Sequence, residues 1–365
     1  MNERNKKLKD FFPIIREREI ILTEIRANNK LNDLFESWRA DCQNDFLDMC
    51  TGARGVKMLY DSYFKEVLNP EADSERLSNL LSTIIGQKVT VKTVLPNDST
   101  RLGDEASLVI TDIVVELEDS SIANVEVQKI GYAFTGERAS CYSADLLLRQ
   151  YKRVRDARKE KFSYKDISPV YTIVFMEKSP AVFHEYKSSY IHTFETKSNT
   201  GIHLNMLQNF IFIPVDIFLE NLHNNGIRDD LDAWLTFLGC DEPEYIIDLI
   251  EEYPYFKRLY EDLYTMCLNT ERVMDMFSKE LQILDRNTVS YMIDEMQAEI
   301  DRANAIIADK DAELADKDTA LADKDAELAD RDSTIAELKA QNDKTMAEMS
   351  AQIAMLTAKL SELNK

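Results

Sequence analysis

The chain has 365 residues and a formal net charge of −22 at pH 7. This length allows one large domain or two smaller ones, and an apolar content of 44% can fill a packed core. The sequence has no run of 18 apolar residues, and its charged start is followed by no signal-peptide core, so we expect a cytoplasmic protein that does not enter a membrane.

Cysteine and histidine patterns argue against zinc and disulfide chemistry. The five cysteines are scattered and show no CxxC spacing, and the four histidines have no HExxH or catalytic-triad context. We expect the histidines to be structural or exposed.

Charge is distributed unevenly along the chain. Residues 298–365 hold 9 Lys+Arg and 16 Asp+Glu, which leaves 35 and 50 for residues 1–297, a net charge of −15. Residues 129–165 are an exception to the acidic character of the chain, because they hold 10 basic and 4 acidic residues. A local charge of +6 on an acidic protein is typical of a surface that contacts a phosphate backbone, although a solvated helix face is the commoner reason for such a run.

The N-terminal part of the chain is predicted to be helical. Apolar residues recur at helical spacing through residues 14–50, with a break at Asn28-Asn29, and again through residues 59–69. A further helix is predicted over Ser74–Ile85, ending at Gly86.

Three strands follow these helices. The first is Val89–Leu95, and the next two, Leu108–Leu117 and Ile122–Gln128, are joined by a polar tetrad that indicates a hairpin. Folding the hairpin about residue 119 pairs positions whose numbers sum to 238, so Asp112 faces Glu126. Because side chains alternate along a strand, Gln128 points the same way as Glu126.

Two carboxylates held together among Val and Ile would cost several kcal/mol in repulsion and desolvation. A divalent cation removes that cost, and hard oxygen ligands completed by water describe a Mg²⁺ site open to a substrate phosphate. The alternative is that Asp112 is exposed and Glu126 pairs with a lysine. The spacing alone does not decide between them.

The middle of the chain returns to an alternating pattern. A long helix is predicted over residues 138–162, a buried strand over Pro169–Met176, and one more strand with a turn over Phe210–Phe218. Residues 229–297 are helical in pattern throughout. The order indicates an α/β fold with a mixed sheet flanked by helices.

The composition changes sharply near residue 298, where a seven-residue repeat begins. Its aspartates are poor core residues, but the last three heptads carry a better apolar seam at Met346, Met349, Ile353, Leu356, Leu360 and Leu363. We expect residues 335–365 to form a coiled coil that makes the protein a homo-oligomer, with the earlier repeats as a charged stalk. An isolated helix without a partner is the alternative.

Several segments match a known family. The chain resembles the PD-(D/E)XK nuclease family transposases and the Rpn-like recombination-promoting nucleases in the run TDIVVELEDSSIANVEVQKIGYAFTGERASCYSADLLLRQYKRVRD and in the shorter runs GVKMLYDSYFKEVLNPE, LDAWLTFLGCDEPE and MFSKELQILDRNTVSYMIDEMQ. The resemblance covers roughly residues 14–297. It implies a restriction-endonuclease-like αβββαβ core, which we place at residues 56–225, preceded by a helical segment (1–55) and followed by a helical subdomain (226–297). The coiled-coil tail (298–365) lies outside the resemblance.

The resemblance also implies roles for single residues. Asp112 matches the motif aspartate and Glu126 the (D/E), so both are expected to bind Mg²⁺, for which Mn²⁺ can substitute, together with the Val127 carbonyl. Gln128 stands at the lysine position, where a neutral amide can only hydrogen-bond. Lys65 is a candidate for the missing positive charge, although an ion pair with Asp61 at i,i+4 is the alternative.

The predicted function is metal-dependent hydrolysis of DNA with little sequence preference, which promotes recombination or transposition. The basic helix is expected to hold the DNA backbone without reading sequence, through Arg138, Arg149, Gln150, Lys152 and Arg153. Two other interpretations stay open: an inactive nuclease fold used as an oligomeric scaffold, and an RNA-directed or defence nuclease on the same fold.

Overall fold

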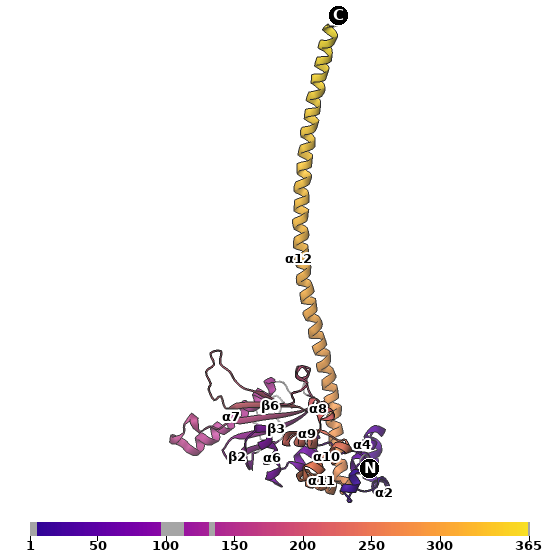
Figure 1. The fold of residues 1–365 in the computed structure, drawn as a ribbon, viewed down its shortest axis with the longest axis vertical. Coiled ribbons are helices and arrows are strands. Elements are labelled where there is room, and N and C mark those ends of the chain that lie inside the picture. The colour runs from indigo at the N-terminus through magenta and orange to yellow at the C-terminus, as the bar shows by residue number, and fades with distance from the viewer. Residues whose placement is uncertain (1–5, 96–112, 131–135, 364–365) are drawn as a thin grey trace. The chain divides into compact units, whose positions relative to one another are not determined.

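The computed structural model describes residues 6–95, 113–130 and 136–363 (Figure 1). The chain divides into two compact units, Met1–Met292 and Ile293–Lys365. In the part of the chain that the model describes, no helix combines the length and the apolar character that spanning a membrane requires.

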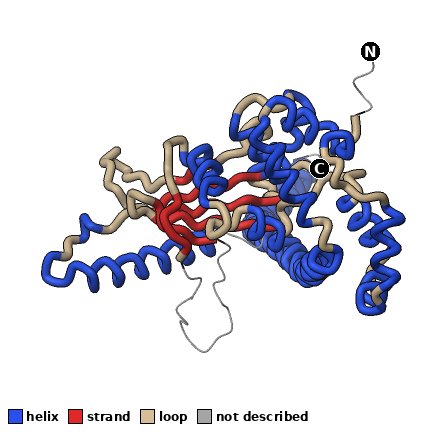
Figure 2. Tube along the Cα trace, turned by 90° about the horizontal axis from the view of Figure 1, so that it is seen from below, coloured by secondary structure: helices blue, strands red, loops and turns tan. Residues whose placement is uncertain are grey.

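A six-stranded mixed sheet lies at the centre of the first unit, in the order β1-β2-β3-β4-β6-β5 (Figure 2). The bounds are β1 (Val91–Val94), β2 (Ile113–Leu117), β3 (Ile122–Ile130), β4 (Val170–Lys178), β5 (His192–Phe194) and β6 (Gln208–Pro214). The β1–β2–β3 and β5–β6 pairs are antiparallel, whereas β3, β4 and β6 run parallel. With α6 (Ser74–Ile85) before β1 and α7 (Gly136–Arg158) between β3 and β4, the predicted αβββαβ order is confirmed.

The hairpin has the register that the sequence predicts. Ile113 pairs with Val125, and the three following pairs also have residue numbers that sum to 238. The turn needs no glycine because Ser120 itself adopts a φ of 67°, and the Asp119 carboxylate accepts a 2.9 Å hydrogen bond from the Ser121 amide. Asp112 lies outside the described residues.

The two faces of the sheet are covered differently. Helix α7 covers one face, where Leu146 packs with Ile122 of β3 and Tyr142 packs with Val174 of β4. The other face joins a larger hydrophobic core that the remaining helices complete. These are α1 (Leu8–Phe11), α2 (Arg18–Ala27), α3 (Asn29–Ser37), α4 (Ala40–Cys50), α5 (Asp61–Val67), α8 (Val215–Asn225), α9 (Asp230–Gly239), α10 (Pro243–Glu252), α11 (Pro254–Met266) and the first turns of α12 (Thr270–Leu363).

Sequence segments predicted as separate domains share that larger core. Phe12 stacks against Tyr264 with ring centroids 5.2 Å apart, and Trp38 contacts Phe277 at 5.1 Å. Residues 1–55 and 226–292 therefore pack with the sheet as one compact unit. The second unit, by contrast, is the later part of α12, and the apolar side chains described there are exposed.

Most element boundaries follow local sequence signals. Gly86 caps α6 in the left-handed conformation, and Asn28 caps α3 by accepting a 3.1 Å hydrogen bond from the Lys30 amide. One prediction was incomplete, because β6 ends at Pro214 and the next residues begin helix α8. The three-residue strand β5 was not predicted, since it is too short to show an alternating pattern.

A buried ion pair links β3 to α12 on the core face. The Lys129 ammonium lies 3.0 Å from Oε2 of Glu280 and 3.6 Å from the centre of the Tyr60 ring. Lys129 Nζ and Glu280 Oε2 are at ion-pair distance but are not aligned for a hydrogen bond. Oε1 of Glu280 accepts a 2.9 Å hydrogen bond from the Ser62 amide. Glu280 is 0% exposed. Because both charged atoms are buried, water could not solvate one of them if the other were removed.

Replacing Glu280 by Gln should therefore lower the free energy of unfolding by about 3–5 kcal/mol, because the Lys129 charge would remain buried and unpaired. Urea denaturation would measure it. The matched control is Asp275→Asn on the same helix, whose ion pair with Lys279 is exposed and should change stability by less than about 1 kcal/mol. Equal effects of both substitutions would contradict a stabilising role for the buried pair.

Candidate active site

Strand β3 presents a row of polar side chains to α7. Asn124, Glu126 and Gln128 alternate with Val125 and Val127, which point toward the larger core. Asn124 and Glu126 are buried, at 0% and 1% exposure, and Gln128 is half-buried. The strand period predicted that Glu126 and Gln128 share a face, because side chains alternate along a strand.

Glu126 is held from its own strand. Nδ2 of Asn124 donates a 3.0 Å hydrogen bond to Oε1 of Glu126. This bond orients the carboxylate and partly offsets the cost of burying it. Sequence reasoning missed Asn124, although its position two residues before Glu126 on the same strand was a sufficient signal.

Three further oxygens near this level of the sheet have no hydrogen-bond partner among the described residues. They are Oδ1 of Asn124, Oγ1 of Thr172, which β4 places in register with Asn124, and Oγ of Ser143 on α7. Buried polar atoms without a partner are uncommon in folded proteins and call for an explanation. Carboxylate, amide and hydroxyl oxygens are hard donors, which fit Mg²⁺ better than a soft metal.

The described residues supply only part of a metal site. Among them no three His, Cys, Asp or Glu side chains come close enough to hold an ion. The predicted partner of Glu126 is Asp112, outside the described ranges, so the predicted ligand pair is not tested here. The Val127 side chain is half-buried against the core face, and a ligand role for its carbonyl stays a prediction.

Lys65 on α5 pairs with Asp61, its Nζ lying 2.8 Å from Oδ1. This is the i,i+4 pair that the sequence offered as the alternative to a catalytic role. The ion pair leaves the Lys65 side chain about one-third exposed.

The basic side chains of α7 differ in their contacts with the rest of the protein. Those on its first four turns contact protein groups: Arg138 donates 2.7 Å to the Tyr142 hydroxyl and Arg149 pairs with Asp145. Arg153 pairs at 2.8 Å with Glu116 of β2, whereas Lys152 is exposed.

Gln150 is structural rather than a surface residue. It is 2% exposed, its Oε1 accepts 2.8 Å from the Ser168 amide, and its Nε2 donates 3.2 Å to the Ser120 carbonyl. The amide therefore ties α7 to the turn before β3 and to the loop before β4, and its burial does not suit contact with a DNA backbone.

The histidines offer no nucleophilic machinery. His184 lies 3.1 Å from the Ser179 hydroxyl and 3.3 Å from Asp216, but the same ring nitrogen makes both contacts. A catalytic triad needs one nitrogen for each partner. His223 stacks on Tyr245.

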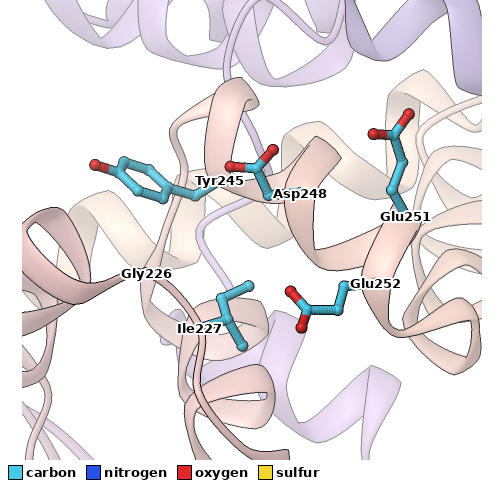
Figure 3. A pocket seen from close by; sticks show the side chains of 6 residues that line it. All are labelled: Gly226, Ile227, Tyr245, Asp248, Glu251 and Glu252. Carbon is cyan, nitrogen blue, oxygen red and sulfur yellow. The ribbon is translucent and has the colours of Figure 1, made fainter.

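A hollow of about 490 Å³ beside α10 is acidic and does not suit a phosphodiester. Figure 3 shows its lining, with the carboxylates of Asp248, Glu251 and Glu252 around it. Burial and the neighbouring Glu251, Glu244 and Glu252 raise the pKa of the Asp248 carboxyl above its usual value. A phosphate placed here would meet the same repulsion.

Comparison with known proteins agrees with the fold. No curated protein and no solved structure matches the chain. The model of the family described as "PD-(D/E)XK nuclease family transposase" matches residues 58–292, which contain the whole sheet, α7 and the buried pair of Lys129 with Glu280. Because that match covers more than half of the sequence, the chain belongs to the PD-(D/E)XK nuclease family transposases.

Proposed function

We propose that this protein is a metal-dependent DNA endonuclease that hydrolyses phosphodiester bonds with little sequence preference. The observation that carries the proposal is the Glu126 carboxylate, which is buried and hydrogen-bonded on β3. The sequence resemblance matches this residue to the (D/E) of the family motif. A buried carboxylate on a strand face is a group that a divalent cation can bind. Family membership supports a role in nuclease or transposase chemistry.

Asp112 and Glu126 are the proposed ligands of the ion, with the Val127 carbonyl as a third. The choice of Asp112 rests on the hairpin register, in which paired numbers sum to 238 at four consecutive positions. When bound, Mg²⁺, or Mn²⁺ in its place, lowers the pKa of a water molecule and neutralises charge on the scissile phosphate. Asn124 holds one oxygen of Glu126 in a fixed orientation.

Gln128 follows Glu126 on the same face and is more exposed, so it suits contact with the attacking water or the scissile phosphate. Its amide donates a hydrogen bond but brings no charge. Lys65 is the proposed source of that charge.

DNA backbone contacts are proposed for the exposed side of α7, with Lys152 and Arg153 as the central residues and Arg138 and Arg149 beside them. These contacts would position the duplex without reading its sequence. Gln150 is left out because its amide is buried. Strand breaks made in this way would promote recombination or transposition through repair of the cut DNA.

Nicking of supercoiled plasmid tests the proposal. Wild-type protein with Mg²⁺ or Mn²⁺ should convert plasmid to the open circle, and Asp112→Ala and Glu126→Gln should each abolish the reaction because each removes a charged ligand. The control is Glu118→Gln in the exposed turn of the same hairpin, which should cut like wild type.

Calorimetry with the metal alone separates the remaining outcomes. Binding that is lost in both ligand variants supports the two-carboxylate site. If wild type neither cuts DNA nor binds metal, the enzyme proposal is wrong and the chain is a scaffold on a nuclease fold.

Gln128 has its own test. Gln128→Ala should lower the cleavage rate about 100-fold, the usual effect of removing one donor near a developing negative charge. Gln128→Lys should keep activity or raise it, because a lysine adds charge at the position where the family motif has one. A rate unchanged in the alanine variant would show that Gln128 takes no part in the reaction.

We also propose that residues 335–365 associate with a second copy of the chain. The seam residues Met346, Met349, Ile353, Leu356 and Leu360 are all exposed in the single chain, with Ile353 at 60%. Apolar side chains at heptad spacing on an exposed helix are the pattern that coiled-coil partners bury.

Light scattering after size exclusion would test this. Wild type should have a mass that is a multiple of 42.1 kDa, and the double variant Ile353→Asp, Leu360→Asp should run as a monomer because it places charges in the seam. Ala351→Asp, on the opposite side of the helix, should keep the wild-type mass. A monomeric wild-type protein would exclude the coiled coil.

A further inference from the structure

The C-terminal end of α7 carries an aromatic and basic surface whose rings have no part in the proposed cleavage site. The helix continues past the ends of the strands in both views (Figures 1 and 2). The chain then turns through two short 3-10 segments, Lys159–Lys161 and Tyr164–Asp166. We call the rings of Tyr151, Phe162 and Tyr164 with the cations around them the platform.

The three rings form an ordered cluster. Tyr151 and Tyr164 are parallel within 6° with centroids 5.9 Å apart, and Phe162 meets Tyr164 edge-on at 5.3 Å. The Arg155 guanidinium lies 5.2 Å from the Tyr151 ring centre and donates 3.2 Å to its hydroxyl. The rings therefore hold one another and a cation in place.

The local backbone fixes Tyr164. Helix α7 ends at Arg158, the next residue Lys159 has a φ of 50°, and the following turn is held by a capping box between Ser163 and Asp166. Asp166 also pairs at 3.0 Å with Arg158. Despite this support the Tyr164 side chain is 73% exposed. A ring that is positioned but not buried is available for a partner.

Charge around the rings points to the same partner class. Residues 151–165 contain seven cations against Asp156 and Glu160, and all seven are exposed: Lys152, Arg153, Arg155, Arg158, Lys159, Lys161 and Lys165. This lies on a body whose net charge is −15. Concentrated positive charge on an acidic protein attracts polyanions and repels itself in their absence.

We propose that the platform binds unpaired nucleotides, with bases stacking on Tyr164 and phosphates contacting the surrounding cations. Aromatic faces combined with cations are the elements of single-strand binding, whereas a duplex keeps its base faces inside the stack. An acidic peptide would use the cations but leave the ring face unused. This proposal rests on the proposed nuclease function for its place in the reaction.

The platform lies at a useful distance from Glu126. Tyr142 packs on Val174, which is in register with Glu126, and 13 residues separate Tyr142 from Arg155. At 1.5 Å per residue the platform is about 20 Å along α7 from the level of Glu126. That corresponds to about six nucleotides at 3.4 Å each. Unpaired DNA flanking a cut or a bubble can reach both.

Fluorescence anisotropy tests binding independently of cleavage, because it is done in EDTA. The probes are labelled dT20, rU20 and a 20-base-pair duplex. Tyr164→Ala should weaken binding of the single strands about 10-fold or more, the effect of losing one stacked base, and leave the duplex within about 2-fold. Tyr164→Phe, which keeps the ring, should bind like wild type. Tyr186→Ala, an exposed tyrosine at another part of the fold, is the matched control.

Each outcome decides the question. Loss with dT20 alone, or with both single strands, supports the platform and identifies the sugar it accepts. Equal affinity of wild type and Tyr164→Ala for both single strands overturns it, as does an equal loss with the duplex. If wild type binds the strands but fails to nick plasmid, the nuclease proposal fails and the platform stands. If it nicks plasmid and Tyr164→Ala binds normally, the platform alone fails.

Discussion

The position of one carboxylate organises the rest of this fold. Glu126 can be buried between the sheet and α7 only because β3 is central, paired with β2 on one side and β4 on the other, so that its backbone groups are satisfied before its side chains are placed. Asn124 then gives the carboxylate a fixed orientation. Burying a carboxylate in this way costs free energy unless hydrogen bonds or charges compensate for it.

Alternation along β3 keeps two kinds of charge on opposite faces. Gln128 faces α7 with Glu126, whereas Lys129, one residue later, enters the core and pairs with Glu280. Although Lys129 directly follows the motif position, it cannot act as the motif lysine, because a side chain on the other face of the sheet cannot reach around the strand. Burial of Glu177 in the same region raises the pKa of its carboxyl, with Lys129 opposing the shift. The core-face lysine is thus already part of a structural network.

Much of the fold followed from the sequence because its signals are local. The hairpin register, the cap at Gly86 and the break at Asn28 each depend on a few adjacent residues. The burial of Gln150 on the basic helix could not be predicted from the sequence. It depends on the turn before β3 and the loop before β4, which come together only in the folded chain. The pairing of Lys129 with Glu280 joins positions 151 residues apart, and no spacing rule reaches that far.

The two halves of α7 show why a run of positive charge is a poor guide to which cation binds a ligand. In the half that covers the sheet, arginines neutralise acids that the fold has half-buried: Arg149 pairs with Asp145 and Arg153 with Glu116. Beyond the sheet Arg158 still pairs with the half-buried Asp166, but the seven cations of residues 151–165 outnumber Asp156 and Glu160 and lie around exposed rings. A phosphate that binds near the first half competes with existing ion pairs, whereas one that binds near the second half relieves repulsion among like charges. The electrostatic gain from nucleic acid is therefore larger at the far end of the helix than beside the buried carboxylate, so binding and cleavage are expected to depend on different parts of α7.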